Sequence, residues 1–127
     1  MRDIIFRGKS GDKWLHWRFA PDGPIHYPVE PIINKSENTI QIHVNPKTVG
    51  QYTGTTDKNG AKIFEGDIVR GYFDDKNPED GTNMLIEWDS ENCRYIALQG
   101  ELVDTFEREF AETLEVIGNK YDNPELF

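Results

Sequence analysis

The sequence has one cysteine, three histidines and no long apolar run. A single cysteine, Cys93, excludes a disulfide within the chain, and its neighbours predict a thiol buried inside a strand. No segment approaches the roughly 20 apolar residues of a membrane-spanning helix, and the first residues lack an apolar run of signal-peptide length. We therefore expect a cytoplasmic protein with no membrane partner.

Clustered positive charge is also missing. The chain has 23 Asp or Glu residues against 14 Lys or Arg, a formal net charge of -9, and its arginines lie singly among acids. Binding nucleic acid through its phosphates requires clustered cations. The composition thus disfavours nucleic acid and favours a protein partner. The acidity itself is explained by solubility, with mimicry of nucleic acid to titrate a DNA-binding protein as the alternative.

Catalytic signatures are absent too. There is no nucleophile elbow, phosphate loop, paired-cysteine motif or His-Glu-x-x-His motif. We predict that the chain is not an enzyme and has no catalytic, cofactor-binding or metal-binding residues. Two alternatives stay open: His16 and His43 could share a metal ion, and the acidic segment 74–80 could bind calcium, although its spacing departs from an EF-hand loop. Glu65 and Asp67 are interpreted as turn residues rather than an acid–base pair.

What the sequence does contain is short alternating strands rich in aromatic residues. In residues 14–19, one side of the predicted strand carries apolar side chains, and the other carries Trp14, His16 and Arg18. Trp and Arg are common anchors of protein interfaces, and an aromatic ring beside a cation can also stack on a base. Trp14, His16 and Arg18 are therefore the candidate macromolecule-binding site.

Turn residues separate the predicted strands. Asn59-Gly60 predicts a hairpin with a type I′ turn, and Glu65-Gly66-Asp67 predicts a second tight turn. The prolines of residues 21–31 predict an extended loop, and Asn45-Pro46 is expected to end a strand over residues 39–44. Residues 102–114 fit a short amphipathic helix, which we favour, although a strand is also compatible with them. Other strands are predicted at 4–8, 62–64, 68–73, 84–89, 93–98 and 115–119.

These elements predict a mainly β protein. Short strands at close spacing with glycine-rich turns are typical of a small SH3-like or related barrel or sandwich. We expect residues 1–127 to form a single domain, with a β extension over residues 1–44 and a barrel-like core over residues 45–127. One short helix completes the predicted fold, and the sequence leaves the oligomeric state open.

Three ordered motifs carry a family resemblance. They are Gly50-Gln51-Tyr52-Thr53-Gly54 with Asp57-Lys58-Asn59-Gly60, then Glu65-Gly66-Asp67-Ile68-Val69, and finally residues 115–126. In these motifs the chain resembles the YopX proteins of bacteriophages and prophages. The resemblance implies a small, mainly β protein that is encoded by a phage or prophage and acts in the cytoplasm of a bacterial host. It supplies no site residues, because the family has no established biochemical role.

The motif residues also have a structural explanation, since glycine, aspartate and asparagine are the residues that tight turns require. We therefore interpret the motifs as a fold signature, and expect a noncatalytic accessory module that binds a macromolecule, with a protein as its partner. The alternatives are a nucleic-acid-binding regulatory protein, an acidic mimic of nucleic acid, and an enzyme using His16 and His43. Five residues should separate the protein-binding, nucleic-acid-binding and mimic hypotheses by how closely they cluster in space. These residues are Arg7, Trp14, Arg18, Arg70 and Arg94.

Overall fold

The computed structural model describes residues 4–19, 26–28, 44–71 and 81–127. The chain divides into two compact units, Met1–Tyr52 (unit 1) and Thr53–Phe127 (unit 2), which are described in turn. The boundary lies within one long strand, β4 (Asn45–Thr56). The predicted division into a β extension and a barrel-like core after residue 44 stays a prediction.

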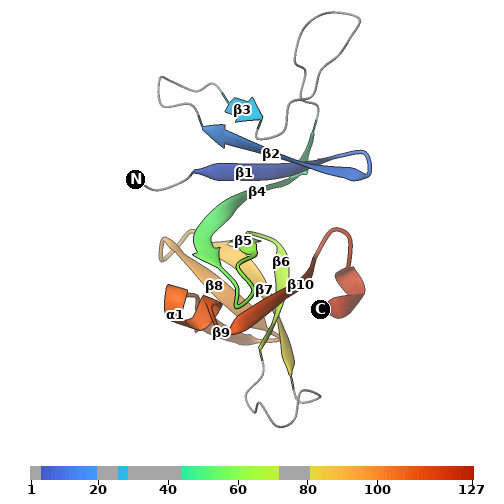
Figure 1. Cartoon of the computed structure of the whole chain (residues 1–127). Coiled ribbons are helices and arrows are strands. Elements are labelled where there is room, and N and C mark those ends of the chain that lie inside the picture. The colour runs from blue at the N-terminus through green and yellow to red at the C-terminus, as the bar shows by residue number, and fades with distance from the viewer. Residues whose placement is uncertain (1–3, 20–25, 29–43, 72–80) are drawn as a thin grey trace, which may run out of the picture. The chain divides into compact units, whose positions relative to one another are not determined.

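Unit 1 is built on a hairpin of β1 (Ile5–Ser10) and β2 (Lys13–Phe19), shown in blue in Figure 1. The predicted turn at Gly11 lies between them, and Gly11 has a φ of +60°, which glycine adopts without strain. β3 (His26–Pro28) pairs with β2, and β4 pairs with β1 on the other side. With β5 (Lys62–Phe64), these strands form the first of two sheets, in the order β3-β2-β1-β4-β5.

Two proline positions correct the sequence prediction. Pro28 was expected in a loop, but it ends β3, an edge strand of the first sheet. Pro46 was expected to break a strand, but it lies in the first residues of β4. Proline is compatible with both places, because edge strands and strand starts leave backbone N–H groups unused. The strand predicted over residues 39–44 lies outside the described residues, except for Val44, which precedes β4.

The hairpin predicted around Asn59-Gly60 is confirmed, but its turn type is not. β4 and β5 (Lys62–Phe64) flank a five-residue loop. The Gly60 N–H donates to the Asp57 carbonyl at 3.0 Å, and the Asp57 N–H donates to the Ala61 carbonyl at 2.8 Å. Gly60 has a positive φ and Asn59 does not. A type I′ turn needs a positive φ at both central residues. The loop is instead a type I turn followed by a left-handed glycine.

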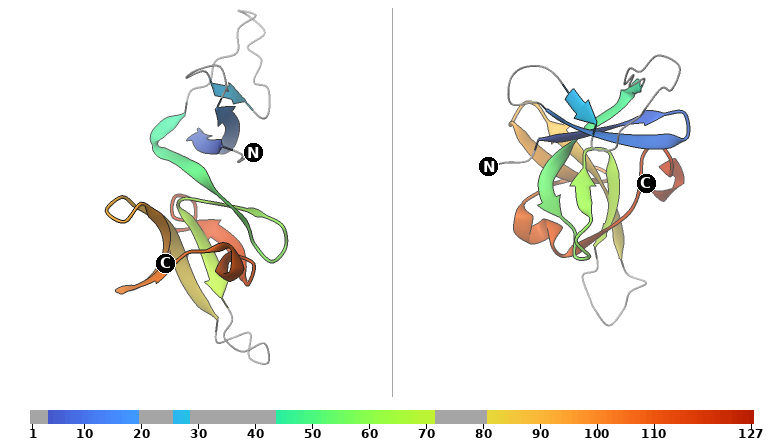
Figure 2. Two further views of the ribbon diagram at one scale, coloured as in Figure 1. Left: turned by 90° about the vertical axis from the view of Figure 1, so that its left-hand side faces the viewer. Right: turned by 45° about the horizontal axis from the view of Figure 1, so that its top comes forward.

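Unit 2 contains the second sheet, with the strand order β10-β6-β7-β8-β9 and antiparallel pairing throughout. Figure 2 shows these strands from two directions. The mainly β prediction is confirmed. The strand pairings do not close either sheet on itself, so the SH3-like barrel stays a prediction. The bounds are β6 (Asp67–Gly71), β7 (Thr82–Asp89), β8 (Arg94–Gln99), β9 (Leu102–Thr105) and β10 (Leu114–Asn119).

The main hydrophobic cluster of unit 2 lies on one face of this sheet, and Ile68 and Leu85 are buried on the other face. Met84 and Ile86 are fully buried two residues apart on β7, as period-2 alternation requires. The helix α1 (Arg108–Ala111) contributes Ala111 to the same cluster. Full burial of an aliphatic side chain is worth about 1.5–3 kcal/mol, so this cluster contributes much of the stability of unit 2. Its members are Ile63, Val69, Met84, Ile86, Ala97, Phe106, Ala111 and Leu114.

Residues 102–114 do not form the helix that we favoured. They comprise the strand β9, the four-residue α1 and the first residue of β10. The spacing of Leu102, Phe106 and Phe110 indicated one helical face, but Leu102 is 63% exposed and only Phe106 is buried. Pairing of β9 with β8 therefore overrides the helical pattern. The predicted final strand is confirmed, and Asn123-Pro124 begins a 3-10 helix, Pro124–Leu126, as its cap and first residue.

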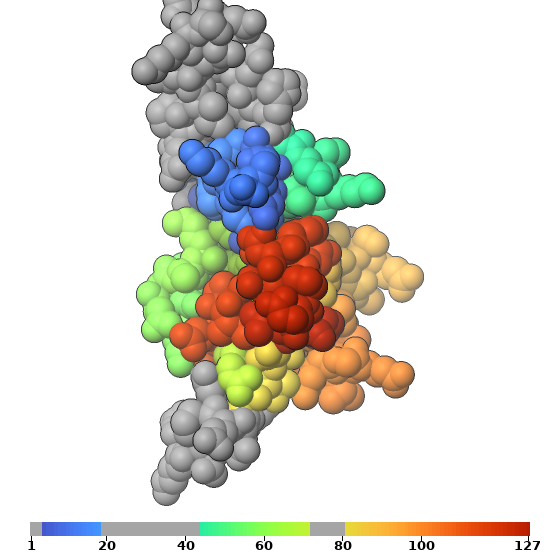
Figure 3. All heavy atoms as spheres, turned by 90° about the vertical axis from the view of Figure 1, so that its right-hand side faces the viewer, coloured from blue at the N-terminus to red at the C-terminus, as the bar shows by residue number. Residues whose placement is uncertain are grey.

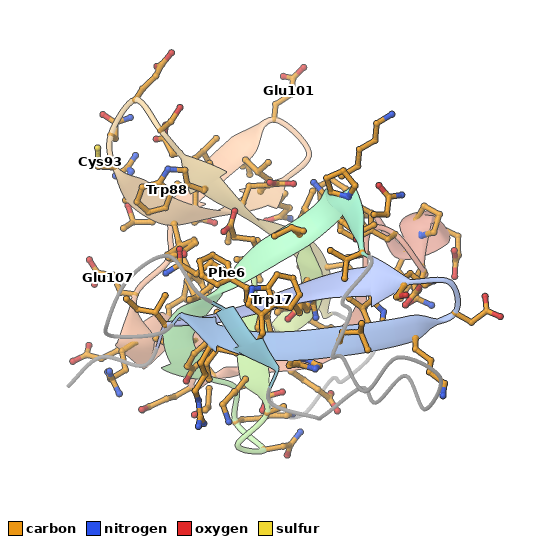
Figure 4. The ribbon with its side chains drawn as sticks, turned by 90° about the horizontal axis from the view of Figure 1, so that it is seen from above. Phe6, Trp17, Trp88, Cys93, Glu101 and Glu107 are labelled. Carbon is orange, nitrogen blue, oxygen red and sulfur yellow. The ribbon has the colours of Figure 1, made fainter. Side chains whose placement is uncertain are left out.

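Cys93 is neither buried nor in a strand. It is exposed in the turn between β7 and β8, beyond the end of both strands (Figure 4), with a φ of +52°. The carboxylate of Asp89 organises this turn, because it accepts hydrogen bonds from the Glu91 N–H at 3.2 Å and from the Asn92 side chain at 2.8 Å. The predicted strand therefore begins one residue later, at Arg94.

Across the described residues, no helix has the length and apolar character needed to cross a membrane.

Candidate functional site

The predicted site residues Trp14, His16 and Arg18 lie on one side of the β1–β2 hairpin. In this antiparallel pair, Arg7 is opposite His16 and Lys9 is opposite Trp14. Directly opposed residues share a face of the sheet, and so do residues two apart on one strand. The structure therefore brings these five side chains onto one surface, which we call the β1–β2 basic face. It includes two cations from β1 that the sequence prediction had not placed there.

The centre of the β1–β2 basic face is a cation–aromatic pair. The guanidinium carbon of Arg7 lies 4.7 Å from the centroid of the Trp14 ring. Arg7 is only 9% exposed, Trp14 and His16 are half-buried, and Arg18 is exposed. A cation over an indole face is attractive, and more so where water is partly excluded. Arg7 thus holds the Trp14 ring in place, while Arg18 presents its charge to solvent.

The opposite side of the hairpin is packed with aromatic residues. Phe6 and Trp17 are stacked, with ring centroids 6.1 Å apart and an interplanar angle of 20° (Figure 4). A Cβ added to Gly8 would lie 3.0 Å from the Trp17 ring and 3.1 Å from the Val44 side chain. The backbone of β1 therefore passes close to its neighbours at a position that needs glycine. The hairpin thus has one mainly aromatic side and one basic side, and the basic side also carries Ile5, which is opposite Arg18 and 3% exposed.

The remaining two arginines of the clustering test lie in unit 2. The guanidinium of Arg70 donates to the Asn83 side-chain oxygen at 2.8 Å. Arg94 donates to the Thr105 hydroxyl at 3.0 Å and lies 3.7 Å from a carboxylate oxygen of Asp89. β6 and β8, which carry these arginines, are separated by β7 in the sheet. The clustering is therefore partial, with Arg7, Arg18 and Trp14 together and the others in separate polar contacts.

Charge is divided unequally between the two units. Unit 1 has seven Lys or Arg residues and five Asp or Glu, a formal net charge of +2. Unit 2 has seven and eighteen, a formal net charge of -11. The acidity that disfavours nucleic acid is thus a property of unit 2, and the β1–β2 basic face belongs to the unit without it.

The signature residue Asp57 connects two motifs that are far apart in sequence. Its carboxylate is 4% exposed and accepts three backbone hydrogen bonds, from Asn59 at 2.8 Å, Ala61 at 2.9 Å and Val116 at 2.9 Å. Burial raises the pKa of Asp57, but the three N–H donors outweigh it, with help from the charge of Lys58, and the pKa lies below its ordinary value. The side chain therefore fixes the hairpin loop to β10 as a carboxylate.

The second signature turn is also connected to the C-terminal motif. Gly66 has a φ of +86°, its N–H donates to the Ile86 carbonyl at 2.7 Å, and its carbonyl accepts from the Lys120 N–H at 2.9 Å. Asp67 is 1% exposed and accepts a hydrogen bond from the Phe64 N–H at 2.8 Å. The Asp67 carboxylate closes the turn between β5 and β6, in agreement with its interpretation as a turn residue.

Side-chain amides shape the C-terminal motif. The Asn119 side-chain oxygen accepts from the N–H groups of Tyr121 at 3.0 Å and Asp122 at 2.9 Å. The Asn123 side-chain oxygen accepts from the Asn119 N–H at 3.3 Å, and it lies only 2.5 Å from where a Cβ on Gly118 would be. Figure 3 shows this segment, in red, against the green and yellow parts of unit 2. Its chain end is held as well, since Asn83 donates to the Leu126 carbonyl at 2.8 Å.

Lys120 adds an ion pair to the same region. Its ammonium nitrogen lies 2.8 Å from a carboxylate oxygen of Glu87 on β7 and 5.3 Å from the centroid of the Tyr121 ring. Burial lowers the pKa of Lys120, but the hydrogen bond and charge of Glu87 outweigh it and raise the pKa above its ordinary value. Apart from Gly50–Tyr52, which belong to unit 1, the three signature motifs meet within unit 2, and their turn residues are explained by contacts that shape its turns.

Sequence reasoning missed the long-range part of this network. Asp57 was recognisable as a turn former, but its bond to the Val116 backbone spans 59 residues and leaves no pattern in the sequence. Among the described residues, no group of three or more His, Cys, Asp or Glu could hold a metal ion. His43 and the acidic segment 74–80 lie outside the described residues, so the histidine pair and the calcium loop stay untested.

The two open sheets and the connected turns define a small, mainly β protein with a basic aromatic face on its N-terminal unit. The family model described as YopX protein matches residues 25–127, and the chain belongs to this family, as the motifs indicated. The chain is similar to the crystal structure of protein EF1440 from Enterococcus faecalis, with a TM-score of 0.53 and 23% identity over 97% of this chain and 96% of that one. That likeness supports the fold alone. No curated protein matches the sequence.

Proposed function

We propose that this YopX-family protein is a noncatalytic module that binds a partner protein through the β1–β2 basic face. The observation that carries the proposal is the Arg7–Trp14 pair, which sits beside Lys9 and the exposed Arg18. We place the protein in the cytoplasm of a bacterial host, encoded by a phage or prophage, as the family resemblance implies.

The chemistry of the face supports a protein partner. Trp and Arg dominate the binding energy of protein interfaces when they occupy the centre of the contact. The stacking of Arg7 holds the Trp14 ring before binding, which lowers the entropy lost on association. The neighbouring cations favour a partner surface with carboxylates, because complementary charge speeds encounter and selects the partner.

Nucleic acid is the second candidate, and the same face favours it. Cations interleaved with an aromatic ring are typical of single-strand binding surfaces. The number of accessible cations counts against nucleic acid. The face has only three permanent cations, and one of them, Arg7, is buried against the Trp14 ring. Phosphate binding depends on several exposed cations, and the net charge of -9 repels a polyanion. The acidic-mimic alternative is supported by the charge of unit 2, but it gives the β1–β2 basic face no role.

Affinity capture from host-bacterial lysate with the full chain tests this proposal. Arg18→Glu and Lys13→Glu make the same charge change on the same strand, but Lys13 is on the opposite side of β2. We expect Arg18→Glu and Trp14→Ala to reduce the captured partner at least about tenfold and Lys13→Glu to leave it unchanged. Equal capture by all variants would overturn the proposal. A partner that disappears on nuclease treatment would replace it with the nucleic-acid candidate.

A further inference from the structure

The strand β9 ends the second sheet without a further strand beside it in the part of the chain that the structure describes. It pairs only with β8, and all four of its residues are exposed. Two of them are apolar, Leu102 at 63% and Val103 at 53% exposure. An edge strand with apolar side chains and no proline is the kind of edge on which another strand can pair.

The hydrogen-bond alternation shows which backbone groups face outward. The Phe106 N–H donates to the Tyr95 carbonyl at 3.1 Å, which marks a bonded position of the β8–β9 ladder. Bonded positions recur at every second residue of an antiparallel pair. Leu102 and Asp104, four and two residues earlier, are therefore bonded to β8. Val103 and Thr105 lie at the alternate positions, and their N–H and carbonyl groups point away from the sheet.

Acidic side chains surround this edge. Glu101 precedes β9, Asp104 lies within it and Glu107 follows it, and all three are exposed. Figure 4 shows Glu101 and Glu107 pointing away from the ribbon. Two more exposed acids, Glu109 and Glu112, lie in and just after α1. Within residues 101–112 the only cation is Arg108, and Arg94 of β8 donates to the Thr105 hydroxyl. A strand added here would therefore meet five exposed acids and two cations, a rim of net negative charge.

We propose that the β9 edge binds an extended, basic segment of a partner protein as an additional strand. Main-chain hydrogen bonds from Val103 and Thr105 supply the pairing, and alternating side chains supply the selectivity. Lysine or arginine on one side of the segment meets Asp104 and the acids at the strand ends, while apolar residues on the other side meet Val103. A second copy of this chain fits poorly, because antiparallel pairing of two β9 edges places Glu101 against Glu107.

This surface is on unit 2 and does not depend on the β1–β2 basic face, so either proposal can fail alone. The test uses the full chain labelled with ¹⁵N and a capped peptide of alternating lysine and valine. We expect saturating peptide to slow amide exchange at Val103 and Thr105 at least about tenfold, because these N–H groups become hydrogen-bonded. The amides of Leu102 and Asp104, already bonded to β8, should change much less.

Two altered peptides serve as controls that require no change to the protein. The same peptide N-methylated at alternate residues cannot pair, and one with glutamate in place of lysine has the wrong charge; both should fail to protect Val103 and Thr105.

In the protein, Glu101→Gln with Glu107→Gln should weaken binding of the lysine peptide roughly fivefold. The matched pair Glu91→Gln with Glu125→Gln, also exposed, should leave the dissociation constant within about twofold. Equal protection by the N-methylated or acidic peptide would overturn the proposal. So would concentration-dependent protection without peptide, which would assign the edge to a second copy.

Discussion

Asp57 shows how one side chain can connect distant parts of a small β protein. A buried carboxylate is costly unless its oxygens accept hydrogen bonds. Here, three backbone N–H groups from the hairpin loop and from β10 satisfy it. The loop therefore has one stable conformation only when β10 is in place, and the signature aspartate links the first and last strands of unit 2.

The substitution Asp57→Asn tests this role. An asparagine keeps one oxygen for Asn59 and Ala61 but turns an NH2 group toward the Val116 N–H, leaving that buried donor unsatisfied. We expect a loss of about 2 kcal/mol in the free energy of unfolding at neutral pH, measured by urea titration. The exposed Glu112→Gln is the control and should change stability by less than about 0.5 kcal/mol.

The pH dependence of this difference follows from the lowered pKa of Asp57. A carboxylate whose folded pKa is depressed stabilises the protein above its unfolded pKa, about 3.9, and loses that contribution as pH falls through the folded value. The gap between wild type and Asp57→Asn should therefore shrink progressively below about pH 3.9. A gap that stays constant into strong acid would show that Asp57 does not act as a carboxylate.

At the residue scale, turn chemistry was predictable and its partners were not. Gly60 and Gly66 were identified as turn formers because few other residues tolerate their positive φ, and Asp57 because its side chain can accept hydrogen bonds from the nearby backbone. Cys93 was misplaced, because its positive φ is imposed by the Asp89-centred turn, and cysteine carries no signal for that conformation. At the candidate site, alternation along β2 placed Trp14, His16 and Arg18 together. The contribution of Arg7 required the pairing register of β1 with β2.

At the scale of elements, the C-terminal segment is held by close contacts between short side chains. Gly118 lies within β10, and a Cβ there would be 2.5 Å from the Asn123 oxygen and 2.8 Å from its amide carbon. The same oxygen accepts the hydrogen bond from the Asn119 N–H. The glycine therefore leaves room for the contact that folds the tail back after β10.

We expect Gly118→Ala to lower the free energy of unfolding by about 1–2 kcal/mol, because the Asn123 side chain must move and release the Asn119 N–H. Chemical denaturation of the full chain measures this. The double variant Gly118→Ala with Asn123→Ala lacks the two closest contacts and keeps only the one with the Cβ of residue 123, at 3.1 Å. Gly118→Ala should therefore cost less stability in the Asn123→Ala background than in the wild type. Additive losses in the double variant would place the cost of the alanine elsewhere in the strand.

Element prediction failed where two periodicities overlapped. Residues 102–114 contain apolar residues at spacings that suit a helix, yet β8 offers β9 a free edge, and the helix shrinks to four residues. The strand β7 was located correctly because its pairing with β6 and β8 agrees with the pattern, although its burial does not alternate: Met84, Leu85 and Ile86 are all buried, and Trp88 is exposed. Pro28 and Pro46 were taken as breaks, but a strand tolerates proline where no ladder donor is needed.

At the scale of the whole molecule, composition predicted the mainly β class and the net charge but concealed how the charge is divided. A total of -9 combines +2 on unit 1 with -11 on unit 2. The division follows from where the chain separates into units, within β4, which no sequence pattern marks. It gives the two proposed surfaces opposite signs, so they select partners of opposite charge.

A formal charge of -11 on unit 2 also predicts a response to salt. Self-repulsion destabilises a compact state, and the screening length falls from about 30 Å to about 10 Å as ionic strength rises from 0.01 M to 0.1 M. We expect the midpoint of thermal unfolding to rise by several degrees over this range.

Glu91→Lys with Glu112→Lys, at two exposed positions, changes the charge of unit 2 to -7 and should make this rise smaller. Because the repulsion is partly removed, the double variant should also be the more stable protein at low salt. A midpoint that falls with salt would mean instead that attractive pairs such as Lys120–Glu87 outweigh the repulsion.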